Sequence, residues 1–254
     1  MAEPSTIQVR QLVNVDYVTL NRPEVRNAFN EQVIAEMTTW AERAAADKGL
    51  RAVVIDGHGP SFCAGADLAW MAKMAGYTQE ENLRDARAAG AMFDAIDRLP
   101  VPVIAQIHGA ALGGGAGLAA VADIAVAADD TTFGFTEVKL GLIPAVIAPY
   151  VLAKIGRSAA RELFITGRRF DAAHAKAIGL VHAVVPGAAL IDTVNKYLIE
   201  IAANGPEAMQ AAKALLRRIA DESIADAAPI TAQAIADRRV SAEAQKMMKR
   251  FLKR

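Results

Sequence analysis

The sequence is nearly free of cysteine, with Cys63 the only one in 254 residues. One thiol cannot form an internal disulfide, which is typical of proteins from reducing compartments. Residues 1–10 contain neither an apolar signal core nor an Arg-rich amphipathic run, so no targeting peptide is expected. Together these absences predict a cytoplasmic protein.

The chain also lacks an excess of either sign of charge, because 28 Lys and Arg residues balance 28 Asp and Glu residues. This balance argues against nucleic acid or an acidic membrane as a partner. The mostly apolar stretch 101–128 is interrupted by Gln106, His108 and Asp123, so it does not read as a membrane span. The four histidines show no metal-ligand spacing, and no metal is expected.

Glycine, in contrast, is concentrated in one place. Gly113, Gly114 and Gly115 follow the apolar stretch 103–107 at the point where a helix should begin. Glycine removes the side chain that would block a ligand, and the first turn of a helix offers unpaired N–H groups. A dinucleotide-binding turn fits poorly, because Leu118 stands where its last glycine should be. The pattern predicts a site for developing negative charge.

Residues 61–68 have the same character. They follow the apolar run 52–55 and contain Gly65 before a second helix start. Two strand-to-helix turns of this kind can direct two backbone donors at one oxygen atom.

Residues 62–68, 109–115 and 135–144 resemble, in that order, motifs of the crotonase family, the enoyl-CoA hydratases and isomerases. The similarity runs from residues 20–23 to the basic C-terminus. Residues 137–151 are similar to the branch of branched and methylglutaconyl-type enoyl-CoA hydratases. The resemblance implies an acyl-CoA substrate and a homotrimer or homohexamer.

The alternation of short apolar runs with helical patterns predicts an α/β fold, and the resemblance implies a crotonase-like spiral of strand-strand-helix turns with a helical C-terminal region. We divide the chain into a spiral core, 1–186, and a helical C-terminal trimerisation region, 187–254. The predicted strands are 17–20, 52–55, 103–107, 124–127 and 181–185. The predicted helices are 30–48, 79–98, 189–203, 208–220 and 225 to the end.

By motif position, the resemblance assigns the N–H groups of Ala66 and Gly114 to the thioester oxygen as it becomes an enolate. Glu137 is the predicted acid/base, because a glutamate in the mostly apolar stretch 135–138 is either paired or functional. No cofactor is expected, since coenzyme A enters as part of the substrate.

The chain departs from the common hydratase pattern. Gly117 stands where family hydratases carry a second, water-orienting glutamate, and Ala145 stands where diene-shifting members carry an aspartate. Three functions therefore stay open. Hydration of an enoyl-CoA is preferred, movement of a β,γ double bond by the single glutamate is the alternative, and a non-catalytic acyl-CoA-binding subunit is the third. Gly117 is expected to face the acyl group and to leave room for it.

The substrate-binding residues are also carried over from the family. Arg26 matches a basic residue that faces the CoA phosphates, and Ala64, Asp67 and Leu68 match the segment along the adenine and pantetheine. Phe251 and Lys253 resemble the terminal helix that closes over the nucleotide, often from a neighbouring subunit.

Three other polar residues have structural interpretations. Asp67 follows the Gly65 turn directly and is predicted to cap a helix. His108 ends a strand and is predicted to be hydrogen-bonded within the fold. Cys63 is predicted to be a small buried thiol.

Overall fold

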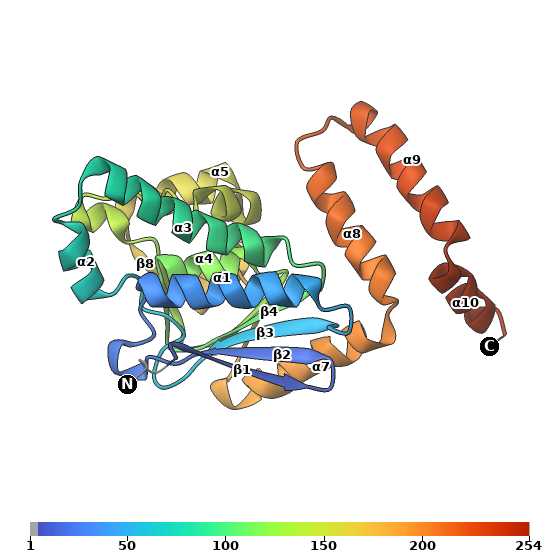
Figure 1. Ribbon diagram of the computed structural model, residues 1–254, viewed down its shortest axis with the longest axis horizontal. Coiled ribbons are helices and arrows are strands. Elements are labelled where there is room, and N and C mark those ends of the chain that lie inside the picture. The colour runs from blue at the N-terminus through green and yellow to red at the C-terminus, as the bar shows by residue number, and fades with distance from the viewer. Residues whose placement is uncertain (1–4, 254) are drawn as a thin grey trace.

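The computed structural model describes residues 5–253, and its centre is a twisted six-stranded sheet (Figure 1). The sheet has the order β1-β2-β3-β4-β6-β9; β1 pairs with β2 antiparallel and the other pairs are parallel. Its strands are Ile7–Leu12, Val15–Leu20, Ala52–Gly57, Val103–Ile107, Ile124–Ala128 and Ala183–Val185. Parallel neighbours need crossover connections, which the helices supply.

Helices cover both faces of this sheet. α1 (Glu31–Ala46) and α3 (Gln79–Asp97) lie over one face, and α7 (Leu190–Ala203) lies under the other (Figure 1). Alternate residues of β3 serve the two sides: Val53 and Ile55 join the core beneath α1, whereas Ala52 and Val54 pack against α7. This two-sided burial explains why the parallel strands are almost continuously apolar.

The helix starts follow local capping rules. The Asn30 side chain accepts a hydrogen bond from the Val33 N–H at the start of α1. Thr78 and Glu81 form a reciprocal capping box at the start of α3. Such caps satisfy N–H groups that a helix leaves without an internal partner.

A smaller three-stranded sheet places the two glycine turns. Its order is β5-β7-β8, with β5 (Ala110–Leu112) parallel to β7 (Thr132–Gly134) and β7 antiparallel to β8 (Arg169–Asp171). The short helix α4 (Gly114–Val121) begins directly after β5, and all of its residues after Gly114 are buried. α5 (Ala148–Thr166) and α6 (Ala172–Ala177) complete this side.

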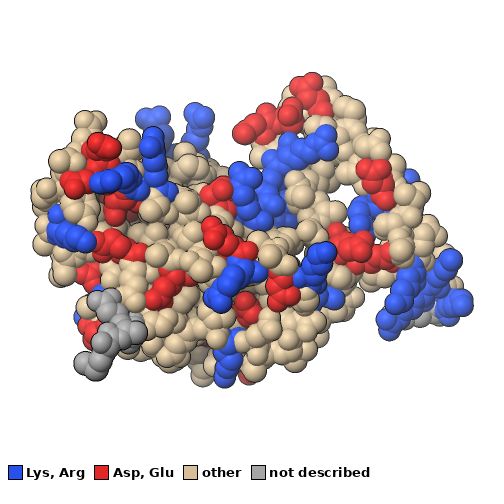
Figure 2. Space-filling model, in the orientation of Figure 1, with Lys and Arg blue, Asp and Glu red and all other residues tan. Residues whose placement is uncertain are grey.

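The C-terminal helices form an arm that leaves the body of the molecule (Figure 1). None of its three helices has a fully buried residue; they are α8 (Pro206–Arg218), α9 (Ile224–Val240) and α10 (Ala242–Phe251). An ion pair from Lys213 to Asp123, at 2.6 Å, ties α8 to the body. Figure 2 shows Lys and Arg side chains gathered over α10.

The predicted α/β class and helical C-terminal region are confirmed, and the strand 103–107 agrees to the residue. Three differences stand out. β1 and α5 were not predicted, and the helix from 225 onward is two helices that meet at Ser241. The boundary at 186/187 stays a prediction, although α7 packs into the sheet core beyond it. In the described part of the chain, no helix has both the length and the apolarity needed to cross a bilayer.

Candidate active site

The turn after β3 is fixed against β5 by backbone hydrogen bonds. The Cys63 N–H donates to the Ala110 carbonyl at 2.9 Å, and the Leu112 N–H donates to the Cys63 carbonyl at 3.0 Å. Gly65, with φ of 101°, then turns the chain into α2 (Leu68–Met74). A side chain at this backbone angle would be strained, so glycine is required here.

The second turn packs directly against the first. Gly113, with φ of 49°, joins β5 to α4. A Cβ at Gly115 would lie 2.5 Å from the Cys63 carbonyl oxygen, which only glycine avoids. A Cβ at Gly113 would lie 3.8 Å from the Cα of Gly65. The two glycine turns that the sequence pattern singled out are therefore in contact.

Two backbone N–H groups of the described chain have no backbone acceptor where the two glycine turns meet. Phe29 bonds through its N–H to the Gly65 carbonyl and through its carbonyl to the Asp67 N–H, so the Ala66 N–H faces away from Phe29. Gly114 is the first residue of α4, and its N–H has no acceptor within the helix. Among residues 5–253, neither the Ala66 nor the Gly114 N–H has a backbone acceptor, and both residues line one cavity.

Glu137 lies at the same place. It begins a 3₁₀ turn, Glu137–Leu140, after the buried Phe135, and a Cβ at Gly113 would lie 3.1 Å from its Oε1. Its Oε2 is buried with no hydrogen-bond partner among the described residues. Burial raises the pKa of the Glu137 carboxyl above its usual range. A partly desolvated carboxylate with one unpartnered oxygen, beside two free donors, is suited to proton transfer.

The cavity that these groups share has a volume of about 290 Å³. Among the described residues that line it, Glu137 is the only carboxylate, and most of the wall is apolar. Its lining residues are Phe29, Ile34, Gly65, Ala66, Trp70, Ala86, Ala89, Phe93, Gly114, Glu137, Ile143, Pro144, Ala145, Val146 and Ile147.

Gly117 does not belong to this lining, contrary to the sequence-based expectation. A Cβ at Gly117 would overlap the Cγ2 of Ile147 and would lie 3.1 Å from the Cε1 of Phe93. Both of those side chains line the cavity. The volume left free by glycine is therefore filled by Ile147 and Phe93, and Gly117 lies behind them.

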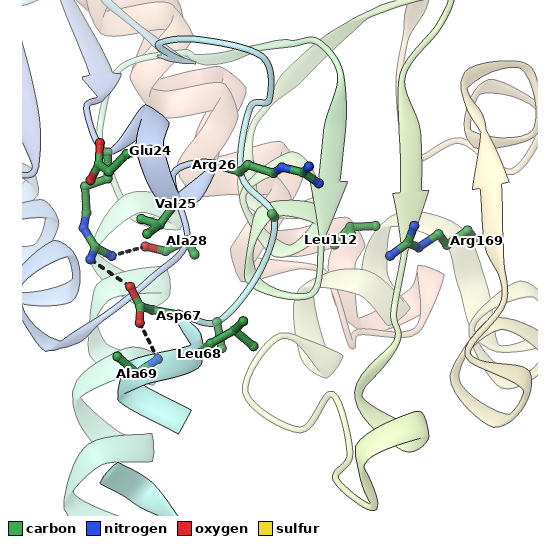
Figure 3. Close-up of a pocket in the computed structure, with 12 residues that line it drawn as sticks. Glu24, Val25, Arg26, Ala28, Asp67, Leu68, Ala69, Leu112 and Arg169 are labelled. Atoms are coloured by element: carbon green, nitrogen blue, oxygen red, sulfur yellow. Dashed lines mark hydrogen bonds and ion pairs between the residues drawn. The ribbon is translucent and has the colours of Figure 1, made fainter. Parts of the chain in front are cut away.

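A second pocket, of about 720 Å³, adjoins the cavity, and Ala66 lines both (Figure 3). The structure brings together here all four residues that the sequence assigned to the CoA segment and its phosphates: Arg26, Ala64, Asp67 and Leu68. Two further arginines, Arg22 and Arg169, line the same pocket.

The three arginines differ in their partners. Arg22 is engaged, because it donates to the Ala28 carbonyl at 2.6 Å and pairs with Asp67 at 2.8 Å. The side chains of Arg26 and Arg169 have no hydrogen bond or ion pair in the described structure. They reach toward one another from opposite sides of the pocket, with Leu112 between them (Figure 3).

Arg169 was missed from the sequence because it belongs to β8, far along the chain from the other pocket residues. The pair Arg168–Arg169 directly after the helix-ending Gly167 was the available signal. Only the fold shows which of the two arginines lines the pocket. Arg169 does, whereas the Nε of Arg168 pairs with the Oε1 of Glu162 at 2.7 Å.

Asp67 caps α2, as predicted. Its Oδ1 accepts hydrogen bonds from the N–H groups of Ala69 and Trp70, while its Oδ2 pairs with Arg22. Burial alone would raise the pKa of the Asp67 carboxyl, but these hydrogen bonds outweigh it and hold the pKa below its usual range. The carboxylate is therefore committed to holding the pocket wall.

The predicted tail residues lie elsewhere. Phe251 is 75% exposed, and α10 is at the opposite end of the molecule from α2 (Figure 1). Lys253 is also exposed. The structure of one chain thus does not bring Phe251 and Lys253 to its own pocket.

Cys63 and His108 have structural roles, as predicted. Cys63 is fully buried, and burial raises the pKa of its thiol to about 12, so it is not a thiolate at neutral pH. The Nε2 of His108 lies 2.9 Å from the Gly59 carbonyl oxygen.

Comparison with known proteins agrees with this geometry. Residues 11–254 match the family model described as enoyl-CoA hydratase/isomerase. An enoyl-CoA hydratase structure from Shewanella pealeana has 34% identity and a TM-score of 0.94, and the match covers 98% of this chain and 93% of that one. A Legionella pneumophila structure, solved as that of a candidate enoyl-CoA hydratase/isomerase (crotonase), has 43% identity, a TM-score of 0.93, and coverage of 98% and 96%.

A sequence relative points the same way. The enoyl-CoA isomerase/hydratase of Mycosarcoma maydis is 34% identical over 216 residues, which are 80% of this chain and 77% of that protein. The predicted family and fold are confirmed. The chain is an enzyme of the enoyl-CoA hydratase/isomerase family, with the crotonase fold.

Proposed function

We propose that this enzyme binds an acyl-CoA thioester at the junction of its two pockets and uses Glu137 as its single proton carrier. The observation that carries the proposal is the place of Ala66, whose free N–H lies where the arginine-lined pocket and the apolar cavity meet, with Glu137 in the same cavity. The acyl group fills the cavity and the CoA lies along the larger pocket.

In this arrangement the N–H groups of Ala66 and Gly114 bind the thioester oxygen. Donors aimed at an oxygen that gains charge in the transition state are worth on the order of 3 kcal/mol each. The N-terminal end of α4 adds its positive dipole end to the Gly114 donor. Both groups that touch the enolate oxygen are thus backbone N–H donors.

The preferred reaction is reversible hydration of an α,β-enoyl-CoA, in line with the relatives named enoyl-CoA hydratase. Glu137 takes a proton from a water molecule as the water oxygen bonds to the β carbon, and the double-bond electrons move toward the thioester oxygen. When the enolate collapses, Glu137 returns the proton to the α carbon. One water is added, and the carboxylate is regenerated.

Isomerisation of a β,γ double bond is the second candidate, and the cavity wall favours it. Glu137 is the only carboxylate among the described lining residues, and a single base suffices to remove a proton from the α carbon and return it to the γ carbon. No water has to be held for this reaction. Neither reaction requires a further cofactor, because the backbone donors and one carboxylate supply the chemistry.

The two reactions are separated by turnover in isotopically labelled water, with mass analysis of the product. Hydration incorporates the labelled oxygen and yields a product heavier by one water, whereas isomerisation leaves the oxygen count unchanged. A panel of α,β- and β,γ-enoyl-CoAs decides between them. An absence of turnover with both classes, in a protein that binds CoA, would contradict the proposed function.

For the acyl group, we propose a branched or methylglutaconyl-type chain. The support is the similarity of residues 137–151 to that branch and the mostly apolar lining of the cavity, which includes Phe29, Phe93 and Ile147. We expect a higher kcat/KM for a branched enoyl-CoA than for crotonyl-CoA. The opposite order in a competition assay would contradict this assignment.

For the assembly, we propose a homotrimer or homohexamer in which the arm of one chain meets its neighbour. The arm exposes large apolar side chains, among them Ile224 at 93%, Val240 at 79% and Leu252 at 81%. Such surface is normally covered in an assembly. Light scattering that gave the single-chain mass of 26.9 kDa would contradict this state.

A further inference from the structure

A half-buried charge lies at the end of α4 that is remote from the cavity. The ammonium of Lys154, from α5, donates a hydrogen bond to the carbonyl oxygen of Ala122, the residue that follows α4. The C-terminal end of a helix carries the negative end of its dipole, so a cation is favourable there. The opposite end of the same helix presents the Gly114 N–H to the cavity.

α4 is short and enclosed, which makes its two ends electrically close. Its eight residues, Gly114–Val121, span about 12 Å. Gly115–Val121 are all buried, so water has no access along the helix. A charge at this separation in a poorly screened interior has a measurable effect on an ion at the other end.

The groups around Lys154 leave its charge without a matching anion. Asp123 accepts hydrogen bonds from Lys213 of α8 at 2.6 Å and from the Val103 N–H at 2.7 Å. The Oδ2 of Asp97, in α3, lies 3.8 Å from the Nη1 of Arg217, in α8.

His182 also lies near Lys154, and its Nδ1 accepts a hydrogen bond from the Ala125 N–H. Burial lowers the pKa of His182, so it is neutral at pH 7. In this described cluster, the cations Lys154, Lys213 and Arg217 face the two carboxylates Asp97 and Asp123, which leaves one net positive charge.

We infer that Lys154 is a positioning residue for the oxyanion site. The charge of its ammonium acts through α4 and strengthens the hydrogen bond from the Gly114 N–H to the thioester oxygen. The inference rests on the proposed role of Gly114. It adds a residue that touches neither substrate nor Glu137.

This charge disappears within an accessible pH range. Burial lowers the pKa of the Lys154 ammonium to about 8, from the usual 10.5. Turnover should therefore fall as the pH rises through about 8. Folding stability should respond in the opposite direction, because between the two pKa values the unfolded chain binds more protons than the folded one. As far as Lys154 is concerned, raising the pH over this range stabilises the fold.

The test is the pH profile of kcat for the wild type, Lys154→Met and Lys154→Arg, with the exposed Lys176→Met as the matched control. We expect the wild type and the control to lose activity roughly three- to tenfold above pH 8. Lys154→Met should show the reduced activity already at neutral pH and no further decline, and Lys154→Arg should keep its activity across the range.

The variant Lys213→Met provides a second, independent test. Lys213 helps to lower the pKa of Lys154, so its removal should move the decline to higher pH. Thermal unfolding at each pH separates this effect from loss of structure. A decline of equal size and midpoint in Lys154→Met and wild type would overturn the inference.

A readout without turnover distinguishes this inference from the proposed function. The infrared carbonyl band of a bound enoyl-CoA moves to lower frequency as the oxyanion site polarises it. We expect a smaller displacement in Lys154→Met than in the wild type. That result without any turnover would reject the proposed function and keep the inference; turnover with an identical displacement in both proteins would reject the inference.

Discussion

The two adjoining pockets of this enzyme use opposite chemistry. The smaller cavity is apolar, with one carboxylate and two backbone donors, whereas the larger pocket is lined by three arginines. Burial in an apolar wall raises the pKa of the Glu137 carboxyl, which suits this group to carrying a proton. Guanidinium groups at an open surface bind phosphate without changing protonation. Under the proposed function, this difference separates the reacting part of the substrate from the part that only binds.

Replacing Glu137 with Gln should have the largest effect on activity, and it should affect only the smaller cavity. The change keeps the shape and deletes the proton carrier, so kcat should fall about 10²–10⁴-fold while CoA affinity stays within a few fold. Steady-state kinetics and CoA titration measure the two quantities, and exposed Glu200→Gln is the control. A Gln variant with a tenth of wild-type activity would assign the proton transfer to another group.

Gly117→Glu tests how the apolar wall is built. Its side chain overlaps Ile147, so the single variant should be destabilised by about 1–3 kcal/mol and lose activity on the natural substrate. The pair Gly117→Glu with Ile147→Ala provides room for a second carboxylate, and we expect recovered stability and higher crotonyl-CoA hydration. Chemical denaturation and the substrate panel report both. Full stability of the single variant would show that Ile147 does not fill this space.

Arg169→Ala, and separately Arg26→Ala, should affect only the larger pocket. Loss of a charge-assisted hydrogen bond to phosphate should raise KM on the order of tenfold at unchanged kcat. The difference from wild type should vanish with an acyl-pantetheine substrate, which lacks the nucleotide phosphates. Arg168→Ala, which removes the neighbouring arginine outside the pocket, is the control. An equal penalty with both substrates would place the two arginines outside phosphate recognition.

Asp67→Asn should have the smallest effect, of roughly 0.5–1 kcal/mol. Asparagine still caps α2 but cannot form the ion pair with Arg22. Because the folded pKa of Asp67 lies below its unfolded value, wild type holds this stability above the unfolded pKa and loses it as the pH falls through the folded one. Unfolding curves of the two proteins should therefore converge in acid, and a constant gap would contradict the ion-pair explanation.

Prediction from sequence succeeded where the physics is local. Asn30 and Asp67 cap helices through bonds within three residues, and Gly113 precedes α4 because the backbone of the turn, with φ of 49°, needs glycine. It failed where a partner lies far away in the chain. β1 is strongly exposed along most of its length, so its apolar pattern is weak, and β5, β7 and β8 have only three residues each.

The sequence alone determined the two glycine turns, the family and the choice of Glu137, because each depends on residue type and local spacing. Only the tertiary structure decided what those residues face. It placed Ile147 against Gly117, Arg169 opposite Arg26, and Lys154 at the C-terminal end of α4. These contacts join residues far apart in the chain, and close packing, unlike a turn or a cap, leaves no mark in the neighbouring sequence.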